Sequence, residues 1–140
     1  MYPWISFLLS LLFWGAPLLG CAHLVESSKT VWGSSTRALE QARTEALKRS
    51  YRADFGECFD SVLAIVKESG YTIFIQDRVQ RHIVVIGIPG NVDTTEVGIF
   101  FDPQMDGKVK IDISSLSSTA KAKVAEAIFP ELDKKFKSYD

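Results

Sequence analysis

The stretch from residue 54 to residue 88, DFGECFDSVLAIVKESGYTIFIQDRVQRHIVVIGI, decides the fold class of this chain. Residues 54–69 repeat apolar side chains at the three- and four-residue spacing of an amphipathic helix. Asp54 with Glu57 three residues later is typical of a capping box, and Gly70 stands where a left-handed residue often ends a helix. Two apolar, β-branched runs follow. A helix followed by paired strands predicts an α+β fold.

Four strands are expected after this helix, joined by short turns. They cover residues 71–76, 81–88, 93–101 and 107–114. The second run is almost wholly apolar, which predicts a central strand buried on both faces. The fourth alternates Val109, Ile111 and Ile113 with charged residues, which favours one wet face and a place at the sheet edge. Consecutive hairpins predict an antiparallel meander with helices against one face.

Two further helices are expected around this meander. Residues 35–51 carry a narrow, alanine-rich stripe and predict a helix that is a spacer, a cap on the domain or an oligomer contact. Residues 117–139 predict the last helix, capped by Ser117 or Ser118 and kinked or broken at Pro130. The expected fold is therefore α+β, with two N-terminal helices, a four-stranded antiparallel meander and a C-terminal helix packed on one sheet face.

The residues that usually carry chemistry form no convincing set. The strand residue His82 favours a structural role, and His23 has no partner in its segment. Asp102, Asp106 and Asp112 are expected near one hairpin, but they lack the ligand spacing of a calcium loop, and Asp106 is explained by its turn. No zinc-type cluster, phosphate loop or nucleophile elbow is present in the sequence. We therefore expect no enzyme activity, no catalytic residue, no metal site and no cofactor.

The N-terminus predicts a targeting segment. Residues 5–14, ISFLLSLLFW, are too short to cross a bilayer and fit the apolar region of a signal peptide. Leu18-Leu19-Gly20-Cys21 follows and resembles the lipobox of bacterial lipoproteins. The resemblance implies diacylglyceryl transfer to the Cys21 thiol, cleavage before Cys21 and acylation of the new amino terminus. A plain cleaved secretory signal and a buried N-terminal helix are the alternatives.

These features divide the chain into three parts: a signal peptide in residues 1–20, a lipid-anchored tether in residues 21–34 and a single α+β domain in residues 35–140. All 16 Lys and Arg and all 17 Asp and Glu follow Cys21, so the mature net charge is also −1. This balance gives no electrostatic case for nucleic acid. Residues 22–53 carry a local +3, which favours either anionic head groups beside the anchor or a solvated helix face.

The mature chain resembles a loose group of small bacterial envelope lipoproteins. The resemblance rests on the lipobox and on the runs GYTI at 70–73, TTEVGI at 94–99 and VKIDISSLSSTAKAKVAEAIFPEL at 109–132. The helix–sheet–helix order also resembles the carboxy-terminal domains of lipoprotein subunits in outer-membrane β-barrel assembly. The group implies no established activity. It implies a location in the cell envelope, facing the periplasm, and Ala22 after the cysteine suggests the outer membrane by the enteric sorting rule.

Two functions are compatible with an anchor that lacks a catalytic set. The first is a membrane-anchored lipoprotein with a non-enzymatic interaction or structural domain and an envelope protein partner. The alternative is a periplasmic module that binds a lipid or small ligand in an apolar groove between the sheet and the last helix. The groove would be lined by Phe100, Phe101, Phe129 and Phe136. Cys58, on the apolar side of a predicted helix, favours burial over an intermolecular disulfide or a reactive thiol.

Overall fold

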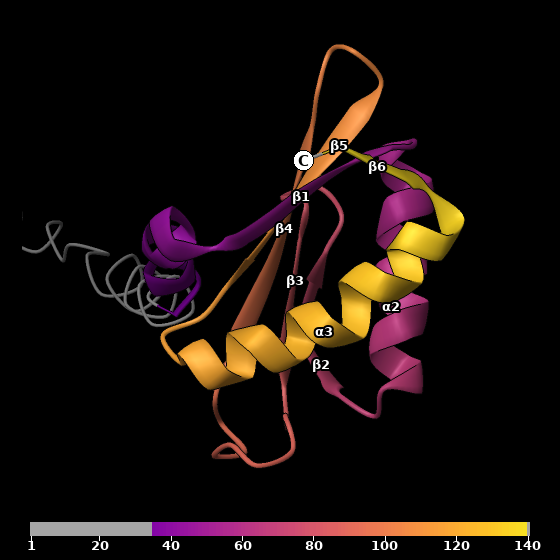
Figure 1. The fold of residues 1–140 in the computed structure, drawn as a ribbon. Coiled ribbons are helices and arrows are strands. Elements are labelled where there is room, and N and C mark those ends of the chain that lie inside the picture. Colours follow the sequence, from indigo (N-terminus) through magenta and orange to yellow (C-terminus); the bar gives the residue numbers. More distant parts are fainter. Residues whose placement is uncertain (1–34, 140) are drawn as a thin grey trace, which may run out of the picture. The chain divides into compact units, whose positions relative to one another are not determined.

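The computed structural model describes residues 35–139 and builds them around one antiparallel sheet with the strand order β2-β3-β4-β5-β1-β6 (Figure 1). A short α-helix over residues 35–41 precedes the other elements. These are η1 (Ala42–Glu45), β1 (Leu47–Arg52), α2 (Phe55–Glu68), β2 (Thr72–Asp77), β3 (His82–Ile86), β4 (Val97–Pro103), β5 (Lys108–Ser114), α3 (Ser118–Lys135) and β6 (Lys137–Tyr139). The predicted signal peptide, cleavage site, tether and Cys21 lie outside the described residues.

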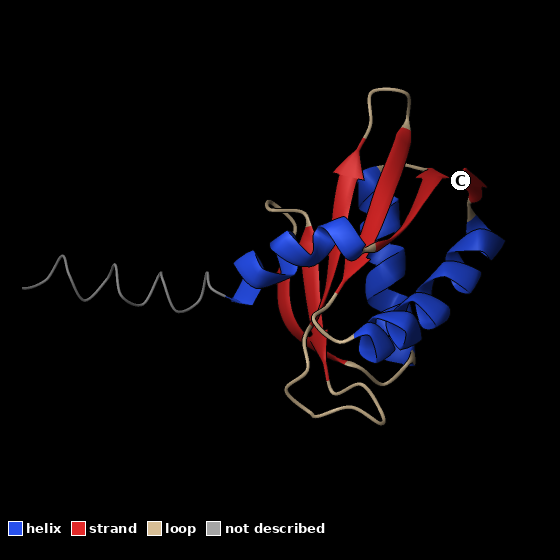
Figure 2. Ribbon diagram, turned by 60° about the vertical axis from the view of Figure 1, so that its left-hand side comes forward, coloured by secondary structure: helices blue, strands red, loops and turns tan. Residues whose placement is uncertain are grey.

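The α+β class and the predicted meander are confirmed. Strands β2 to β5 pair in consecutive antiparallel hairpins, and α2 and α3 lie on one face of the sheet (Figure 2). The Asp54 carboxylate accepts a hydrogen bond from the Gly56 amide at 3.0 Å, so Asp54 caps α2 as predicted. Gly70 has a φ of 78°, the left-handed conformation expected just after this helix.

The predicted helix over residues 35–51 is wrong in its second half. Only residues 35–45 are helical, and β1 pairs with β5 in register from Leu47↔Ile113 to Arg52↔Lys108. Tyr51 is fully buried on the helix side of the sheet. Pairing satisfies the outer backbone groups of β5 and buries Tyr51, so long-range contacts override a weak local preference for helix. For the same reason β5 is an interior strand, and its predicted edge position is wrong.

The C-terminal helix also differs from its prediction. It ends at Lys135, and residues 137–139 form β6, which pairs with β1 at the edge of the sheet. Pro130 lies inside α3 without ending it. The Ser117 hydroxyl accepts a hydrogen bond from the Ala120 amide at 3.2 Å, so Ser117 rather than Ser118 is the cap. The sheet of described residues therefore has six strands, where four were expected.

The main core lies between the sheet and the two long helices. It joins Phe59 and Val62 of α2 to Val124 and Ile128 of α3 and to the inner side chains of the strands. Phe59 packs on Phe101 of β4 with ring centroids 5.2 Å apart. Cys58 is fully buried in this core, as predicted. These contacts cover one face of the sheet and leave the other face to the residues described next.

Candidate functional site

The second face of the sheet is closed over β3 and β4 by the N-terminal helical segment. Leu39 packs there on Val84 and Phe100. Gly98 makes this approach possible, because a Cβ at that position would lie 2.7 Å from the Phe100 ring and 3.4 Å from Leu39 Cβ. His82 stacks on Phe100 with ring centroids 5.9 Å apart and is 7% exposed. The closed half is thus a small second core, and His82 has the structural place that the sequence favoured.

Arg43 fixes this segment to the sheet. Its guanidinium lies 4.7 Å from the centroid of the Phe100 ring. It donates to Asp112 Oδ2 from Nε at 3.1 Å and from Nη2 at 2.8 Å, and to Asp102 Oδ2 at 2.5 Å. Burial alone would lower the pKa of Arg43, but these two carboxylates raise it above its ordinary value. The guanidinium therefore stays charged, and it is the main counter-charge of Asp112, which is 2% exposed.

The three carboxylates singled out in the sequence are only partly brought together. Asp102 and Asp112 share Arg43, whereas Asp106 lies in the β4–β5 turn and pairs with Lys108 at 3.3 Å. Among residues 35–139, no group of three or more His, Cys, Asp or Glu side chains is placed to hold a metal ion. Asp102 and Asp112 act here as the structural partners of a cation.

The apolar groove predicted from four phenylalanines is not formed. Phe101 faces α2, and its neighbour Phe100 faces the opposite side of the sheet under Leu39. Phe129 and Phe136 both pack on Tyr51, with ring centroids 6.5 Å and 6.4 Å away. Adjacent residues of a strand point to opposite faces, so Phe100 and Phe101 were never able to line one groove. All four rings are packing residues.

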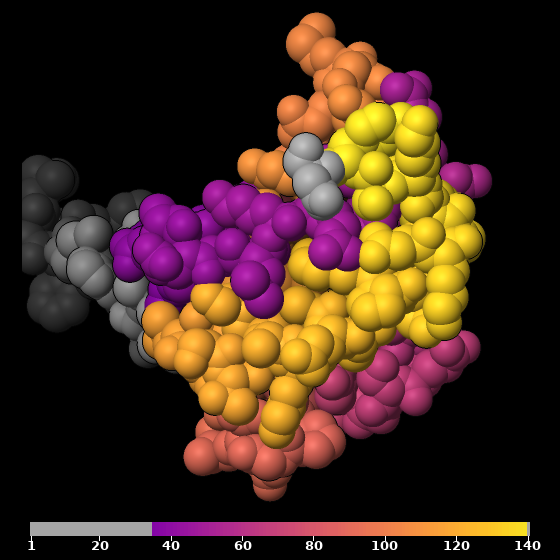
Figure 3. Space-filling view, in the orientation of Figure 1, coloured from indigo at the N-terminus to yellow at the C-terminus, as the bar shows by residue number. Residues whose placement is uncertain are grey.

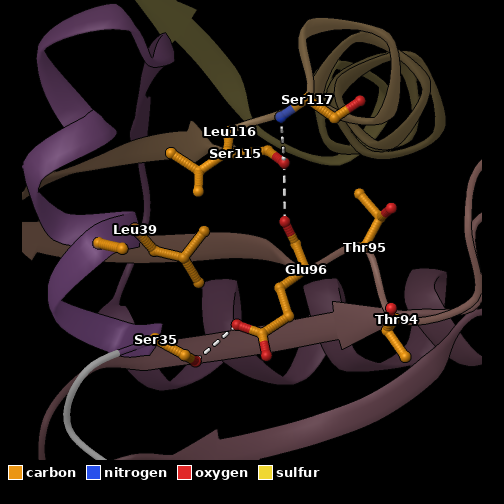
Figure 4. A pocket seen from close by; sticks show the side chains of 9 residues that line it. Ser35, Leu39, Thr94, Thr95, Glu96, Ser115, Leu116 and Ser117 are labelled. Carbon is orange, nitrogen blue, oxygen red and sulfur yellow. Dashed lines mark hydrogen bonds between the residues drawn. The ribbon is translucent and has the colours of Figure 1, made fainter.

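A pocket of about 360 Å³ lies where the N-terminal segment meets the loops before β4 and α3 (Figure 4). Leu39 and Leu116 give it an apolar wall, and Thr94 and Thr95 line another side. Glu96 accepts a hydrogen bond from the Ser35 hydroxyl at 2.6 Å, while the Ser115 hydroxyl donates to the Glu96 carbonyl at 2.7 Å. Serines of the predicted loop are thus occupied with contacts inside the chain.

The other half of this face, over β1, β5 and β6, carries a cluster of cations that we call the basic face. It consists of Lys48, Arg52, Lys108, Lys110, Lys137 and Tyr139. The strand registers Arg52↔Lys108, Arg52↔Lys137 and Ser50↔Tyr139 place these side chains together, on the side of the sheet opposite α2 and α3. Sequence reasoning missed the cluster, because it placed residues 47–51 and 137–139 in helices.

Tyr139 lies at the centre of the basic face. Its ring centroid is 4.4 Å from Lys108 Nζ, 5.4 Å from Lys137 Nζ and 5.6 Å from Arg52 Cζ. Arg52 Nε donates a hydrogen bond to the Tyr139 hydroxyl at 3.1 Å. This bond, with the nearby Lys137 charge, lowers the pKa of Tyr139 below its ordinary value. The shift reports an excess of positive charge around the phenol.

The cations of the basic face are incompletely paired. Lys110 lies 3.6 Å from Asp102, and Lys108 pairs with Asp106. Within residues 35–139, no carboxylate forms an ion pair with Lys48, Arg52 or Lys137, and all three side chains are exposed. Positive charge is therefore available to a partner.

The β4–β5 hairpin projects beside the basic face. In Figures 1 and 3 its tip extends past the neighbouring strands, next to the C-terminal residues. Met105 at this tip is fully exposed. Its neighbour along the turn is Asp106, followed by Gly107 with a φ of 77°, which lets the chain reverse tightly. An apolar side chain thus stands beyond the rim of a cationic surface.

Comparison with family models and with curated proteins adds no relative. A scan against protein-family models gives no match to this chain, and a search of curated proteins finds no similar sequence. No helix within residues 35–139 is both long enough and apolar enough to cross a membrane. Function is therefore inferred from the sequence and from the geometry of the described residues.

Proposed function

We propose that this chain is a membrane-anchored bacterial lipoprotein whose domain acts in the cell envelope by binding, without catalysis. The anchor is the lipid on Cys21 within Leu18-Leu19-Gly20-Cys21, and the domain faces the periplasm. One acyl chain holds a protein only marginally, whereas the two or more that a lipoprotein carries make a stable anchor. Ala22 favours the outer membrane.

The observation that carries the binding role is the contrast between the two halves of the outer sheet face. Over β3 and β4, Arg43 forms ion pairs with Asp102 and Asp112, and the N-terminal segment covers the apolar side chains of the sheet. Over β1 and β6, Lys48 and Arg52 form no ion pair with a carboxylate of residues 35–139, and Asp106 acts on Arg52 only at longer range. An exposed surface with unpaired charge favours a partner of opposite charge, either an envelope protein or a membrane surface.

Native mass spectrometry of protein extracted from membranes in mild detergent tests the anchor. The wild-type chain is expected to have a mass that begins at Cys21 plus acyl chains. The matched variant Cys21→Ser is expected to lack the acyl mass and to leave the membrane fraction. A mature wild-type protein that begins elsewhere and carries no acyl chain would contradict the proposal. Crosslinking before extraction reports a protein partner as additional mass.

A second candidate function is small-ligand binding in the pocket beside Leu39. Its volume of about 360 Å³ falls within the range of small-molecule sites, roughly 300–1,000 Å³. It combines the apolar Leu39 and Leu116 with polar groups from Thr94 and Glu96, as such sites do. A bound molecule in the native mass spectrum, lost in Leu116→Glu, would support this function. Leu116 is exposed, so this substitution leaves the core intact.

A further inference from the structure

We propose that the basic face docks the anchored domain onto an anionic phospholipid surface, with Met105 entering the interface. The inference deepens the proposed function and rests on it only for the tether, because the surface itself belongs to residues 35–139. Three features of the structure support it: the side of the sheet on which the basic face lies, its positive charge and the exposed apolar side chain at the hairpin tip.

The basic face and the point where the domain begins lie on the same side of the sheet. Leu39, four residues after Ser35, packs on Phe100. Phe100 pairs with Asp112 in register, and Asp112 pairs with Lys48, so these side chains share one face. Figure 2 shows the N-terminal helical segment on one side of the sheet and the long helices on the other. A membrane that holds the chain ahead of Ser35 can therefore meet the basic face without α2 or α3 between them.

Charge is distributed unevenly between the basic face and the rest of the chain. Over β1, β5 and β6, this side of the sheet carries six cations, the five of the basic face and Arg43, against the carboxylates Asp102, Asp106 and Asp112, a net of +3. The whole chain carries −1, so the remaining residues, among them Glu40 and Glu45 of the N-terminal segment, carry −4. An anionic membrane attracts the basic face and repels the more acidic remainder, which sets an orientation as well as an affinity.

The exposed tip favours lipid over an acidic protein. Met105 is fully exposed, and Lys108 and Arg52 lie behind it on the basic face. Lipid accepts an apolar side chain at the head-group boundary, while Lys and Arg extend their charged ends to the phosphates. Tyr139 adds an aromatic ring of the kind enriched at this boundary. The cations would also bind an acidic peptide, but such a peptide would not explain the exposed Met105 at the hairpin tip beside them.

The expected strength suits a tethered domain. Each basic residue near an anionic surface strengthens binding about fivefold, so a net charge of three strengthens it about a hundredfold over a neutral surface of the same size. An affinity from this attraction alone is weak for a protein that is free in solution. A flexible linker with the length of the proposed tether, 14 residues, would have a root-mean-square span of ~20 Å and would give a local concentration of the order of millimolar. Weak attraction is then enough to hold the domain against the membrane.

The test uses the mature chain, residues 21–140 with Cys21→Ser, which has no lipid of its own. Residues 35–140 form one compact unit, which has a hydrophobic core between the sheet and the two long helices. Binding is measured by sedimentation with vesicles of phosphatidylcholine and with vesicles that also contain phosphatidylglycerol. We expect binding only to the second kind, and we expect it to fall with added salt.

A variant with Lys48, Arg52 and Lys137 all changed to Gln is expected to bind the anionic vesicles about a hundredfold more weakly. The matched control changes Lys67, Arg81 and Lys134 to Gln, which removes the same charge elsewhere and is expected to weaken binding severalfold at most relative to the parent chain. Met105→Ser is expected to weaken binding without changing the salt dependence. Circular dichroism confirms that each variant is folded.

Equal binding of the two triple variants, or no binding of the parent chain, would overturn the docking proposal. If the parent chain does not bind vesicles and the basic-face variant loses a crosslink to a protein, the basic face binds a protein partner. This result would also overturn the docking proposal. The anchor is judged separately. If the Cys21→Ser chain binds anionic vesicles but the wild-type protein from membranes carries no acyl chain, the docking proposal stands and the anchor proposal fails. If the wild-type protein is acylated but the Cys21→Ser chain binds no vesicles, the anchor proposal stands and the docking proposal fails.

Discussion

Replacing Arg43 by methionine is expected to lower the free energy of unfolding by about 2–3 kcal/mol. The substitution keeps an unbranched side chain over Phe100 but leaves the Asp112 carboxylate, which is 2% exposed, without its main counter-charge. Removing one partner of a buried ion pair costs about 3–5 kcal/mol. The expected cost of about 2–3 kcal/mol for Arg43→Met lies below this range, because the Arg43 side chain is 26% exposed and Lys110 Nζ remains 3.9 Å from Asp112.

The physical cause is tested by a second substitution. If the cost comes from the stranded carboxylate, Asp112→Asn in the Arg43→Met background is expected to restore about 1–2 kcal/mol. The matched control is Lys134→Met, which breaks the exposed pair with Glu131 and is expected to change stability by less than about 0.5 kcal/mol. The control separates a buried charge from a general effect of removing a cation.

Urea denaturation followed by circular dichroism measures the wild type, Arg43→Met, Asp112→Asn, their double variant and the Lys134→Met control. A loss of 2–3 kcal/mol corresponds to a fall in Tm of about 10 °C. A cost for Arg43→Met below about 0.5 kcal/mol would refute the reasoning. The reasoning would also be refuted if Arg43→Met cost as much in the Asp112→Asn variant as in the wild type. The loss would then come from packing on Phe100 rather than from charge. The double-mutant cycle distinguishes these causes.

Two further predictions concern the helices. Ser117→Ala is expected to cost about 1 kcal/mol in urea denaturation, because it removes the acceptor for the Ala120 amide, whereas Ser118→Ala costs less than half as much; a larger cost at Ser118 would contradict the assignment. Burial, with smaller contributions from Glu57 and Asp54, raises the pKa of Cys58 from 9.0 to about 11. The neutral thiol therefore contributes stability that is complete below about pH 9 and is lost as the pH rises toward about 11. Urea titrations across this range are expected to show a steeper loss for the wild type than for Cys58→Ala, and parallel curves would refute it.

The periodic stretches of the sequence predicted their own elements. Asp54, the helical spacing after it and Gly70 predicted α2 and both of its ends, and the apolar run at 81–88 predicted a buried interior strand, which is β3, next to the edge strand β2. These features succeed because capping and helical periodicity depend on residues close in sequence. The burial of Cys58 followed from the same periodicity.

The candidate site was missed because it depends on strands that only long-range pairing creates. Residues 47–52, LKRSYR, contain no β-branched residue, and β6 is only three residues long. Both become strands by pairing, β1 with β5 and β6 with β1. While Arg52 and Lys137 were assigned to different segments at the two ends of the domain, nothing in the sequence placed them beside one another.

The sequence by itself determined the α+β class, the meander, the buried helix α2 and the expectation of a lipid anchor at Cys21. Each of these depends on local pattern or on a short motif. Only the tertiary structure decided that Phe100 and Phe101 serve different cores, that Arg43 covers Asp112, and that Arg52, Lys108 and Lys137 surround one tyrosine. Those contacts join residues up to 87 positions apart, and strand pairing, which satisfies backbone groups far apart in sequence, brings them together.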